Sequence, residues 1–416
     1  MRMKVLISGG GIGGLALALS LHQRLDDVEV HVYEAASTFK PLGLGINLMP
    51  HATRVLSQLG LGEQLTELAV EAQEFTFYTS QGQHIYSEPT GLRAGHAYPH
   101  LSIHRVDLHH VLYHTVVDRI GADRIHTDRR LVDLAQDDSS VTAEFADHTG
   151  KPIDTATGDV LIGADGLHSA ARKKFYPDED APVFHGINMW RGVTLAKPFL
   201  TGASATRIGA LNKTGKLTVY PMRDDIDGKG TQLINWVAEI VTDKASPTDW
   251  SAPGRVDDFI QYFEDWKFDW LDCDALLRNA ESILSYPMVD RDPVERWTFG
   301  RVTLLGDAAH PMYPRGGNGA AQAILDAEAL AGHLSQQRHP KAALADYEKE
   351  RLPIVNNIVL TNRASPPDVL IETVEERTGG AIFERIEDVI SIEEITAISM
   401  GYQKVAGYDT ATVASK

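Results

Sequence analysis

The sequence predicts an α/β protein in which a Rossmann-like nucleotide-binding domain is interleaved with a smaller domain built on a mostly antiparallel sheet, followed by C-terminal helices. Three observations predict this arrangement. A strand, a glycine-rich turn and a helix open the chain, strand-like segments rich in aromatic and β-branched residues fill residues 184–240, and residues 368–400 are acidic and helix-like. The chain of 416 residues has room for roughly two to three domains of ordinary size.

The first predicted elements form a βαβ unit. The apolar run Lys4–Ser8 predicts a buried parallel strand, and Leu15–Leu25 repeats apolar residues at helical spacing. A second β-rich run, Val28–Tyr33, ends at Glu34. This order and these lengths are typical of the first half of a dinucleotide-binding fold.

Between the first strand and the helix lies a G-x-G-x-x-G pattern at Gly9, Gly11 and Gly14. Such glycines allow a tight turn, close approach of the backbone to a pyrophosphate, and packing of the helix on the strand, while N–H groups at the helix start receive the phosphate charge. Glu34 follows twenty residues after Gly14. A carboxylate there accepts hydrogen bonds from a ribose diol and repels a 2′-phosphate, so FAD or NAD is expected rather than NADP.

The later elements follow from hydrophobic periodicity and turn signals. In the first part of the chain we expect a helix within residues 51–72 that ends near Leu59 and Gly60, a strand pair over Glu74–Ile85 around a turn at residues 80–82, a helix over Ile103–Ile120 and a strand over Asp159–Gly163. In the middle we expect strands over Asn188–Leu195, Leu217–Pro221 and Leu233–Val241, and helices over Arg255–Asp265 and Cys273–Ala280. Toward the C-terminus we expect a strand over Arg301–Leu305, a helix over Gly317–Ser335, a linker at residues 364–367, and helical segments over Glu372–Arg377 and Ile382–Val389.

Two further motifs follow predicted strands. Asp165 and Gly166 form a turn after the strand that ends at Gly163, and Asp307 ends the strand that begins at Arg301. Ligands in parallel α/β sheets bind beyond the carboxyl ends of the strands, so Asp307 is expected to accept a hydroxyl proton from a sugar-like chain. A second glycine-rich entry into a helix, at residues 316–319, predicts another anion site.

Composition narrows the class of protein. A formal net charge of −18 disfavours binding to nucleic acid or to an anionic membrane, and no apolar run approaches the length of a membrane span. The basic, apolar N-terminus resembles a signal peptide, but it runs directly into the nucleotide unit, so a cytoplasmic location is expected. Cys273 is the single cysteine, and the seventeen histidines show no H-x-x-x-H pattern with a supporting acid, so no metal site is expected.

With these three motifs the sequence resembles the flavoprotein aromatic hydroxylases, which are single-component FAD-dependent monooxygenases with the p-hydroxybenzoate-hydroxylase fold. Within that family it is most similar to phenazine hydroxylases. The likeness covers about residues 3–363 and includes the stretches Pro41–Asn47, Ser102–Arg105, Met189–Val193, Tyr286–Pro293 and Gly306–Asp326. It implies an FAD-binding domain over residues 1–73, 99–180 and 285–363, a substrate domain over residues 74–98 and 181–284, and a C-terminal helical segment over residues 364–416.

The resemblance also implies roles for particular residues. Glu34 would bind the adenosine ribose, Leu131 the adenine through its backbone, Arg105 the pyrophosphate side, Asp307 the ribitol, and Gly317–Ala320 the pyrimidine edge of the flavin, with Gly43–Ile46 on the other side of the isoalloxazine. The full set expected to bind FAD is Gly9, Gly11, Ile12, Gly13, Gly14, Glu34, Gly45, Arg105, Leu131, Asp165, Asp307, Gly317, Gly319 and Ala320.

The activity implied is hydroxylation of an electron-rich aromatic or heteroaromatic ring by O2 through a C4a-hydroperoxyflavin, with or without decarboxylation. NADH or NADPH would bind transiently, because the sequence holds one G-x-G-x-x-G and no second nucleotide unit. No catalytic triad is expected, since the cofactor carries the hard chemistry. The pocket candidates are Trp190, Arg191, Tyr220, Trp236, Pro314 and Arg315.

Arg315 departs from the phenazine-hydroxylase pattern, in which this position beside the flavin is apolar. One interpretation is that Arg315, aided by Arg191, pairs with a carboxylate on the substrate. The other is that Arg315 faces solvent or an FAD phosphate. On the first interpretation the substrate is an aromatic carboxylate.

Other functions remain open at the level of sequence. A flavoprotein of the same fold could catalyse reduction or halogenation, although the W-x-W-x-I-P signature of tryptophan halogenases is absent. A non-catalytic flavin-binding regulator could recruit a partner through the acidic C-terminal segment. The protein is expected to be a monomer or a homodimer.

Overall fold

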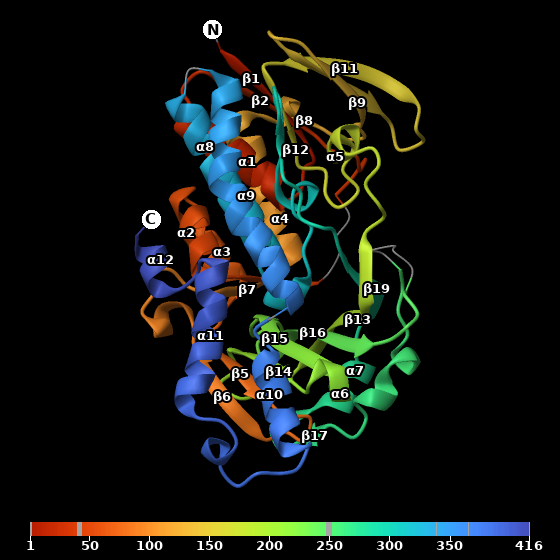
Figure 1. The fold of residues 1–416 in the computed structure, drawn as a ribbon, viewed down its shortest axis with the longest axis vertical. Helices are drawn as coiled ribbons and strands as arrows, with labels where there is room; N and C mark the ends of the chain where they lie inside the picture. Colours follow the sequence, from red (N-terminus) through yellow and green to blue (C-terminus); the bar gives the residue numbers. More distant parts are fainter. Residues whose placement is uncertain (1, 40–43, 247–251, 338, 365, 416) are drawn as a thin grey trace.

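The structure is a computed structural model that describes residues 2–39, 44–246, 252–337, 339–364 and 366–415. Two large sheets lie one above the other along the long axis of the molecule, and long helices run beside both of them (Figure 1). The α/β class, the parallel and antiparallel sheets and the C-terminal helices are therefore confirmed. Gly43 and Ser365, which belong to the predicted flavin-facing segment and the predicted linker, lie outside the described residues.

The upper sheet contains the predicted βαβ unit. Strand β1 (Met3–Ser8) pairs in parallel with β2 (Val28–Tyr33) on one side and with β12 (Val160–Gly163) on the other. The six strands follow the order β20-β21-β12-β1-β2-β8, where the remaining members are β8 (Ile125–His126), β20 (Thr298–Phe299) and β21 (Val302–Leu304). The three strands that precede the glycine motif, Asp165 and Asp307 are thus neighbours, which brings their carboxyl ends together.

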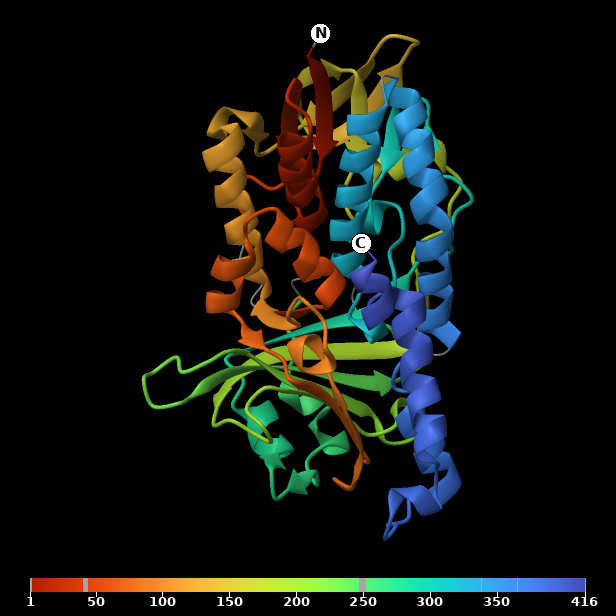
Figure 2. The same ribbon diagram turned by 90° about the vertical axis from the view of Figure 1, so that its left-hand side faces the viewer.

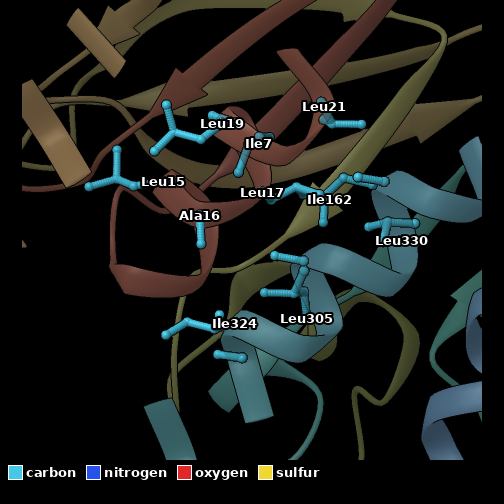
Figure 3. Packing of buried hydrophobic residues seen from close by; sticks show 14 of the residues in the cluster. Ile7, Leu15, Ala16, Leu17, Leu19, Leu21, Ile162, Leu305, Ile324 and Leu330 are labelled. Carbon is cyan, nitrogen blue, oxygen red and sulfur yellow. The ribbon is translucent and has the colours of Figure 1, made fainter. Parts of the chain in front are cut away.

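Helices cover this sheet and form the largest core. Helix α1 (Ile12–Arg24) packs against α8 (Gly319–Gln336) and α4 (Arg105–Ile120), and α9 (Pro340–Ala364) lies along α8. Figure 3 shows the side chains of Leu15 and Leu17 from α1 among those of Ile7, Ile162 and Ile324. All five are buried, so the nucleotide unit stands on a continuous apolar core.

The lower sheet has seven strands in the order β19-β13-β16-β15-β14-β5-β6. All of its pairs are antiparallel except β14 with β5. Its members are β5 (Glu74–Tyr78), β6 (His84–Pro89), β13 (Val183–Ala196), β14 (Ser204–Ile208), β15 (Lys216–Arg223), β16 (Gln232–Val241) and β19 (Ser282–Asp290). Residues 285–290, which the resemblance assigned to the FAD-binding domain, therefore pair with β13 in this sheet.

Smaller sheets and short elements complete the fold. A three-stranded antiparallel sheet is made of β3 (Gly45–Leu48), β7 (Leu101–His104) and β4 (Val70–Glu71), and another of β9 (Arg130–Gln136), β10 (Val141–Ala146) and β11 (Pro152–Gly158). The short elements are α2 (Pro50–Gln58), α3 (Gly62–Leu68), α5 (Ala170–Phe175), α6 (Leu211–Thr214), α7 (Cys273–Arg278), β17 (Lys267–Phe268) and β18 (Leu271–Asp272).

The C-terminal segment reaches back over the molecule. Helices α10 (Val369–Thr378) and α11 (Ile392–Ala406) run beside the lower sheet, and α12 (Thr410–Ala414) returns toward α2 (Figures 1 and 2). Ile371 and Ile395 from these helices are buried with Phe75 and Phe77 of β5. This segment is therefore part of the folded body.

Several predicted boundaries were wrong. The helix expected to end near Gly60 does so, but residues 62–71 form α3 and β4, and the helix expected from Ile103 begins at Arg105 after β7. Residues 255–265 form 3₁₀ turns at Val256–Asp258 and Ile260–Tyr262 that bury Phe259 and Phe263, and the segment Ile382–Val389 contains one short 3₁₀ turn at Ile386–Asp388. In each case packing of a few side chains outweighed local helical periodicity.

Within the described part of the chain, no helix combines the length and the apolarity that crossing a lipid bilayer requires.

Candidate cofactor and substrate site

A cavity of about 420 Å³ lies between the two large sheets. Predicted cofactor residues form one side of it, and one face of the seven-stranded sheet forms the other. The predicted residues that line it are Gly11, Ile12, Gly13, Gly45, Arg105, Arg191, Tyr220, Asp307, Pro314, Arg315, Gly317, Gly319 and Ala320. Residues from Gly11 to Ala320, more than three hundred positions apart in the sequence, are thus brought together.

Two of the N-terminal glycines are required by close backbone packing, and a third borders open space in the cavity. A Cβ at Gly9 would lie 2.1 Å from the carbonyl oxygen of Ala164, and one at Gly14 would lie 2.0 Å from that of Gly9. At Gly11, which borders the cavity, an added Cβ would meet no atom within 4 Å. No side chain caps the start of α1 there. Open space beside free backbone N–H groups fits the pyrophosphate of a dinucleotide.

Glu34 stands at the end of β2 and is held by the backbone. The N–H groups of Gly10 and Ala36 each donate to its carboxylate at 2.8 Å, one to each oxygen. Each oxygen keeps a further lone pair that can accept a ribose hydroxyl. Glu34 and Leu131 are not among the residues that border the cavity, so their expected contacts with adenosine stay predictions.

The turn that carries Asp307 rests on a buried ionic network. Asp326 of α8 accepts from the N–H of Gly306 at 3.2 Å, lies 2.6 Å from Nε2 of His310, and accepts from Nε of Arg351 at 2.8 Å. Burial alone would raise the pKa of Asp326, but His310 and Arg351 hold it below its ordinary value. The side chain of Asp307 is exposed on the cavity wall, where it is free to accept a hydroxyl.

The second glycine-rich turn leads into α8. Gly317 has φ +67°, and a Cβ there would meet no atom within 4 Å, so this edge of the cavity is also open. Asn318 precedes the helix without capping it, and its buried Oδ1 has no hydrogen-bond partner among the described residues. The free N–H groups and the positive end of the helix dipole at the start of α8 suit a ligand whose nearest edge is negatively charged.

Asp165 has a different place from the one expected. Its carboxylate accepts hydrogen bonds from the hydroxyl of Ser169 and from the N–H groups of Ala170 and Ala171 at the start of α5. Burial raises its pKa. Asp165 does not border the cavity, whereas Gly166 beside it does, with open space at its Cα. The turn therefore contributes backbone to the site, and the carboxylate supports that turn.

Side-chain alternation divides the lower sheet into two faces. Arg191, Tyr220 and Val237 face the cavity, while Trp190 and Trp236 pack on the opposite face with Phe259. Nε1 of Trp236 donates to Oγ1 of Thr194 at 3.1 Å. The two tryptophans were therefore wrong as pocket candidates. They sit one position along their strands from residues that face the cavity, which is enough to reverse their direction.

Arg191 is fixed within the wall of the cavity. Its Nη2 donates to the carbonyl oxygen of Gly45 at 2.8 Å, and Tyr220 and Tyr286 flank it. Burial raises the pKa of Tyr220 to about 12, against the opposing effect of Arg191, so its hydroxyl stays protonated at neutral pH.

A buried charged cluster lies beside these residues. Asp368, from the segment before α10, lies 2.9 Å from Nζ of Lys216 and 3.1 Å from Nη2 of Arg315. Lys216 also pairs with Glu239 on β16. Although burial raises it, Lys216 and Arg315 hold the pKa of Asp368 far below its ordinary value. Both interpretations of Arg315 thus miss its observed partner, a carboxylate of the chain itself.

Sequence reasoning missed Arg207, Lys216, Glu239, Tyr286 and Asp368. The available signal was a charged residue inside a predicted strand, Glu239, or directly before one, Lys216, since a charge within a buried strand needs a partner or a ligand. Within the part of the chain that the structure describes, no group of three His, Cys, Asp or Glu side chains is arranged to hold a metal ion.

Comparisons with known proteins agree with this geometry. A family model described as "FAD binding domain" matches residues 2–362. Phenazine 1,6-dicarboxylic acid hydroxylase PhzS of Lysobacter antibioticus is 41% identical over 363 residues, which are 86% of this chain and 89% of that protein. A 3-hydroxybenzoate 6-hydroxylase of Polaromonas naphthalenivorans (strain CJ2) is 31% identical over 87% of this chain and 86% of its own.

Solved structures share the fold at lower identity. Klebsiella pneumoniae HpxO in complex with FAD and uric acid has a TM-score of 0.76 at 22% identity, covering 99% of this chain and 97% of its own. A salicylate hydroxylase substrate complex has a TM-score of 0.74 at 24% identity, covering 100% and 97%.

Proposed function

The chain belongs to the FAD-binding domain family, and from this we propose that it hydroxylates an aromatic carboxylate bound in the cavity between its two large sheets. It is an FAD-dependent monooxygenase: the relatives compared above are named hydroxylases and align with six-sevenths or more of its length. Those names favour oxygen insertion over reduction, halogenation or a purely regulatory role. The carboxylated substrates of the same relatives favour an acid.

One observation carries the proposal. One cavity is bordered on one side by glycines with open space beside their Cα atoms, such as Gly11 and Gly317, and on the other side by the cations Arg191 and Arg207. The protein as a whole carries a net charge of −18. Screening over about 8 Å at physiological salt limits the repulsion by distant surface charge. An anion inside the cavity is therefore governed by the nearby arginines.

The residues present fit FAD. The open backbone at Gly11 and the start of α1 would receive the pyrophosphate, with Arg105 beside it, and Asp307 would accept a ribitol hydroxyl. Glu34 would hold the ribose and Leu131 the adenine. The set proposed for the flavin edge is Gly45, Gly317, Gly319 and Ala320.

When bound, FAD supplies the redox chemistry, which is activation of O2 after reduction by NADH or NADPH and delivery of one oxygen atom to an electron-rich ring. The residues of the chain would bind the substrate, orient its ring and shield it from water. The buried Tyr220 and the half-buried Arg191 form one wall of the cavity, and Met189 and Val289 would add apolar surface against the ring. Exclusion of water from this space protects the reaction from side products.

We also propose the division into an FAD-binding part (1–73, 99–180 and 291–363), a substrate part (74–98 and 181–290, because residues 285–290 pair with β13) and the helical segment 364–416, in a cytoplasmic monomer or homodimer. Light scattering on the purified protein would distinguish the two oligomeric states. Limited proteolysis with and without FAD would report which peptides the cofactor protects.

The function is tested by purification followed by a substrate screen. We expect FAD to co-purify, and aromatic carboxylates to stimulate oxidation of NADH or NADPH with formation of a product that carries one oxygen atom from ¹⁸O2. The mass of the product also shows whether the carboxylate is lost. A protein that holds no flavin, or whose NAD(P)H oxidation is unaffected by every aromatic acid tested, would contradict the proposal.

A further inference from the structure

Four cations of the lower sheet and its surroundings border the cavity, and they are not equivalent. Arg191 donates to Gly45, Lys216 pairs with Glu239 and Asp368, and Arg315 pairs with Asp368. Arg207, on β14, has no ion pair and no hydrogen bond among the described residues. Of these four cations, Arg207 is therefore the one whose N–H groups are available to a ligand.

The position of Arg207 is nevertheless defined. Its guanidinium carbon lies 5.1 Å from the ring centre of Phe75 and 5.5 Å from that of Phe77. Both rings belong to β5, which pairs with β14 so that Arg207 is in register with Phe77. Aromatic faces hold a guanidinium without using its planar N–H edge. Arg207 is thus oriented with its hydrogen-bonding edge available.

The acidic groups near Arg207 are already engaged. Glu88, which borders a second, small pocket together with Arg207, accepts hydrogen bonds from Ser399 and Gln403 of α11, and burial raises its pKa. Asp368 is shared by Lys216 and Arg315. Glu88 and Asp368 interact with Arg207 electrostatically, but neither carboxylate forms an ion pair or a hydrogen bond with it among the described residues, so the N–H groups of Arg207 are left for a ligand.

We infer that Arg207 binds the carboxylate of the substrate and determines selection of acids over neutral rings, whereas Arg315 is held by Asp368 and does not. The inference rests on the proposed function and names the specificity residue of the same site. A bidentate guanidinium–carboxylate pair fixes both the position and the orientation of the ring. The C-terminal segment contributes indirectly, because its Asp368 pairs with Lys216 and Arg315, the other cations that could bind the substrate carboxylate.

The test compares ligand binding in FAD-loaded variants. Benzoate, 3-hydroxybenzoate and phenazine-1-carboxylate, each with its primary amide, are titrated while the visible spectrum of the bound flavin is recorded. The acid-over-amide preference is the ratio of the two dissociation constants. Arg207→Met should weaken binding of the acid by tenfold or more and that of the amide by less than threefold, and Arg207→Lys should retain part of the preference.

Two matched variants serve as controls. Arg315→Met removes a cavity cation of the same type and should affect acid and amide alike, and Arg278→Met removes an exposed arginine of α7 and should change neither constant. An unchanged preference in Arg207→Met, a preference lost in Arg315→Met, or a wild-type protein without any preference for acids would each overturn the inference. Flavin content and ¹⁸O incorporation report on the proposed function separately, so the two can fail independently.

Discussion

The phenol oxygen of Tyr402 lies 3.0 Å from the side-chain nitrogen of Asn318, the residue that precedes α8 on the cavity wall. The same hydroxyl donates to Oδ1 of Asn362 at 2.7 Å. A Cβ at Gly316 would lie 1.5 Å from the oxygen of Tyr402, so the turn requires glycine for this contact. A helix outside the region matched by the family model thus supports the turn expected to meet the flavin.

Tyr402→Phe is therefore expected to loosen this turn while preserving the ring. The change leaves two buried amide groups without their partner, which costs about 1–3 kcal/mol of unfolding free energy. Urea denaturation with and without FAD measures the loss, and fluorescence of the released flavin measures its affinity. The exposed Tyr262, substituted in the same way, is the control. Equal effects of the two substitutions would contradict a specific role for Tyr402.

Asp307→Ala should weaken FAD binding at least tenfold. The substitution removes a charged hydrogen-bond acceptor from the cavity wall, and such bonds are worth roughly 1.5–3 kcal/mol. Equilibrium dialysis of the apoprotein against FAD gives the affinity, with the exposed Asp269→Ala as control. Retention of FAD at wild-type affinity would remove Asp307 from the site.

Glu34→Gln should lower FAD retention, and Glu34→Arg should do so without creating NADP binding, because the ribose at this position is assigned to FAD. The carboxylate also accepts from Gly10 and Ala36, so part of the effect acts through the shape of the turn. Titrations with FAD, NAD and NADP separate the ligands. Tight NAD binding in a wild-type protein that holds no flavin would contradict this assignment.

The buried His100 predicts a pH dependence of stability. Burial lowers the pKa of His100 to about 3, whereas an unfolded histidine has an ordinary pKa near 6.5. Between these values the unfolded chain binds a proton that the folded protein does not, so stability is full above about pH 6.5 and falls as the pH decreases, by roughly 1.4 kcal/mol per unit for this group. Denaturant unfolding at pH 7, 6 and 5 should show a smaller dependence of stability on pH in His100→Asn than in the wild-type protein. Equal pH dependence in the two proteins would contradict a contribution from His100.

Asp326→Asn should destabilise the protein by about 3–5 kcal/mol, because it leaves Arg351 as a buried charge without its carboxylate. The folded-state pKa of Asp326 is lowered, so its contribution is present above the ordinary range of an aspartate and is lost as the pH falls below it. Thermal unfolding of the apoprotein at pH 7 measures the cost. A loss below about 1 kcal/mol would show that the network is not a significant support of the Gly306 turn.

The sequence alone determined the parts of this protein that depend on neighbouring residues. The βαβ unit, the packing and open roles of Gly9 and Gly11, and the strand that delivers Asp307 follow from short-range spacing and backbone conformation, and the structure places Gly11 and Asp307 on one cavity as expected. Boundaries were less well predicted, because burial of side chains such as Phe259 outweighed local periodicity.

Tertiary structure decided which charges are paired and which face the cavity. Asp368 meets Arg315 and Lys216 across 53 and 152 positions of the chain, and this contact leaves Arg207 with the uncommitted guanidinium. Likewise, the direction of Trp236 followed from the register of a strand in a sheet assembled from distant segments. Ion pairing and sheet register depend on long-range packing, for which a single sequence holds no periodic signal.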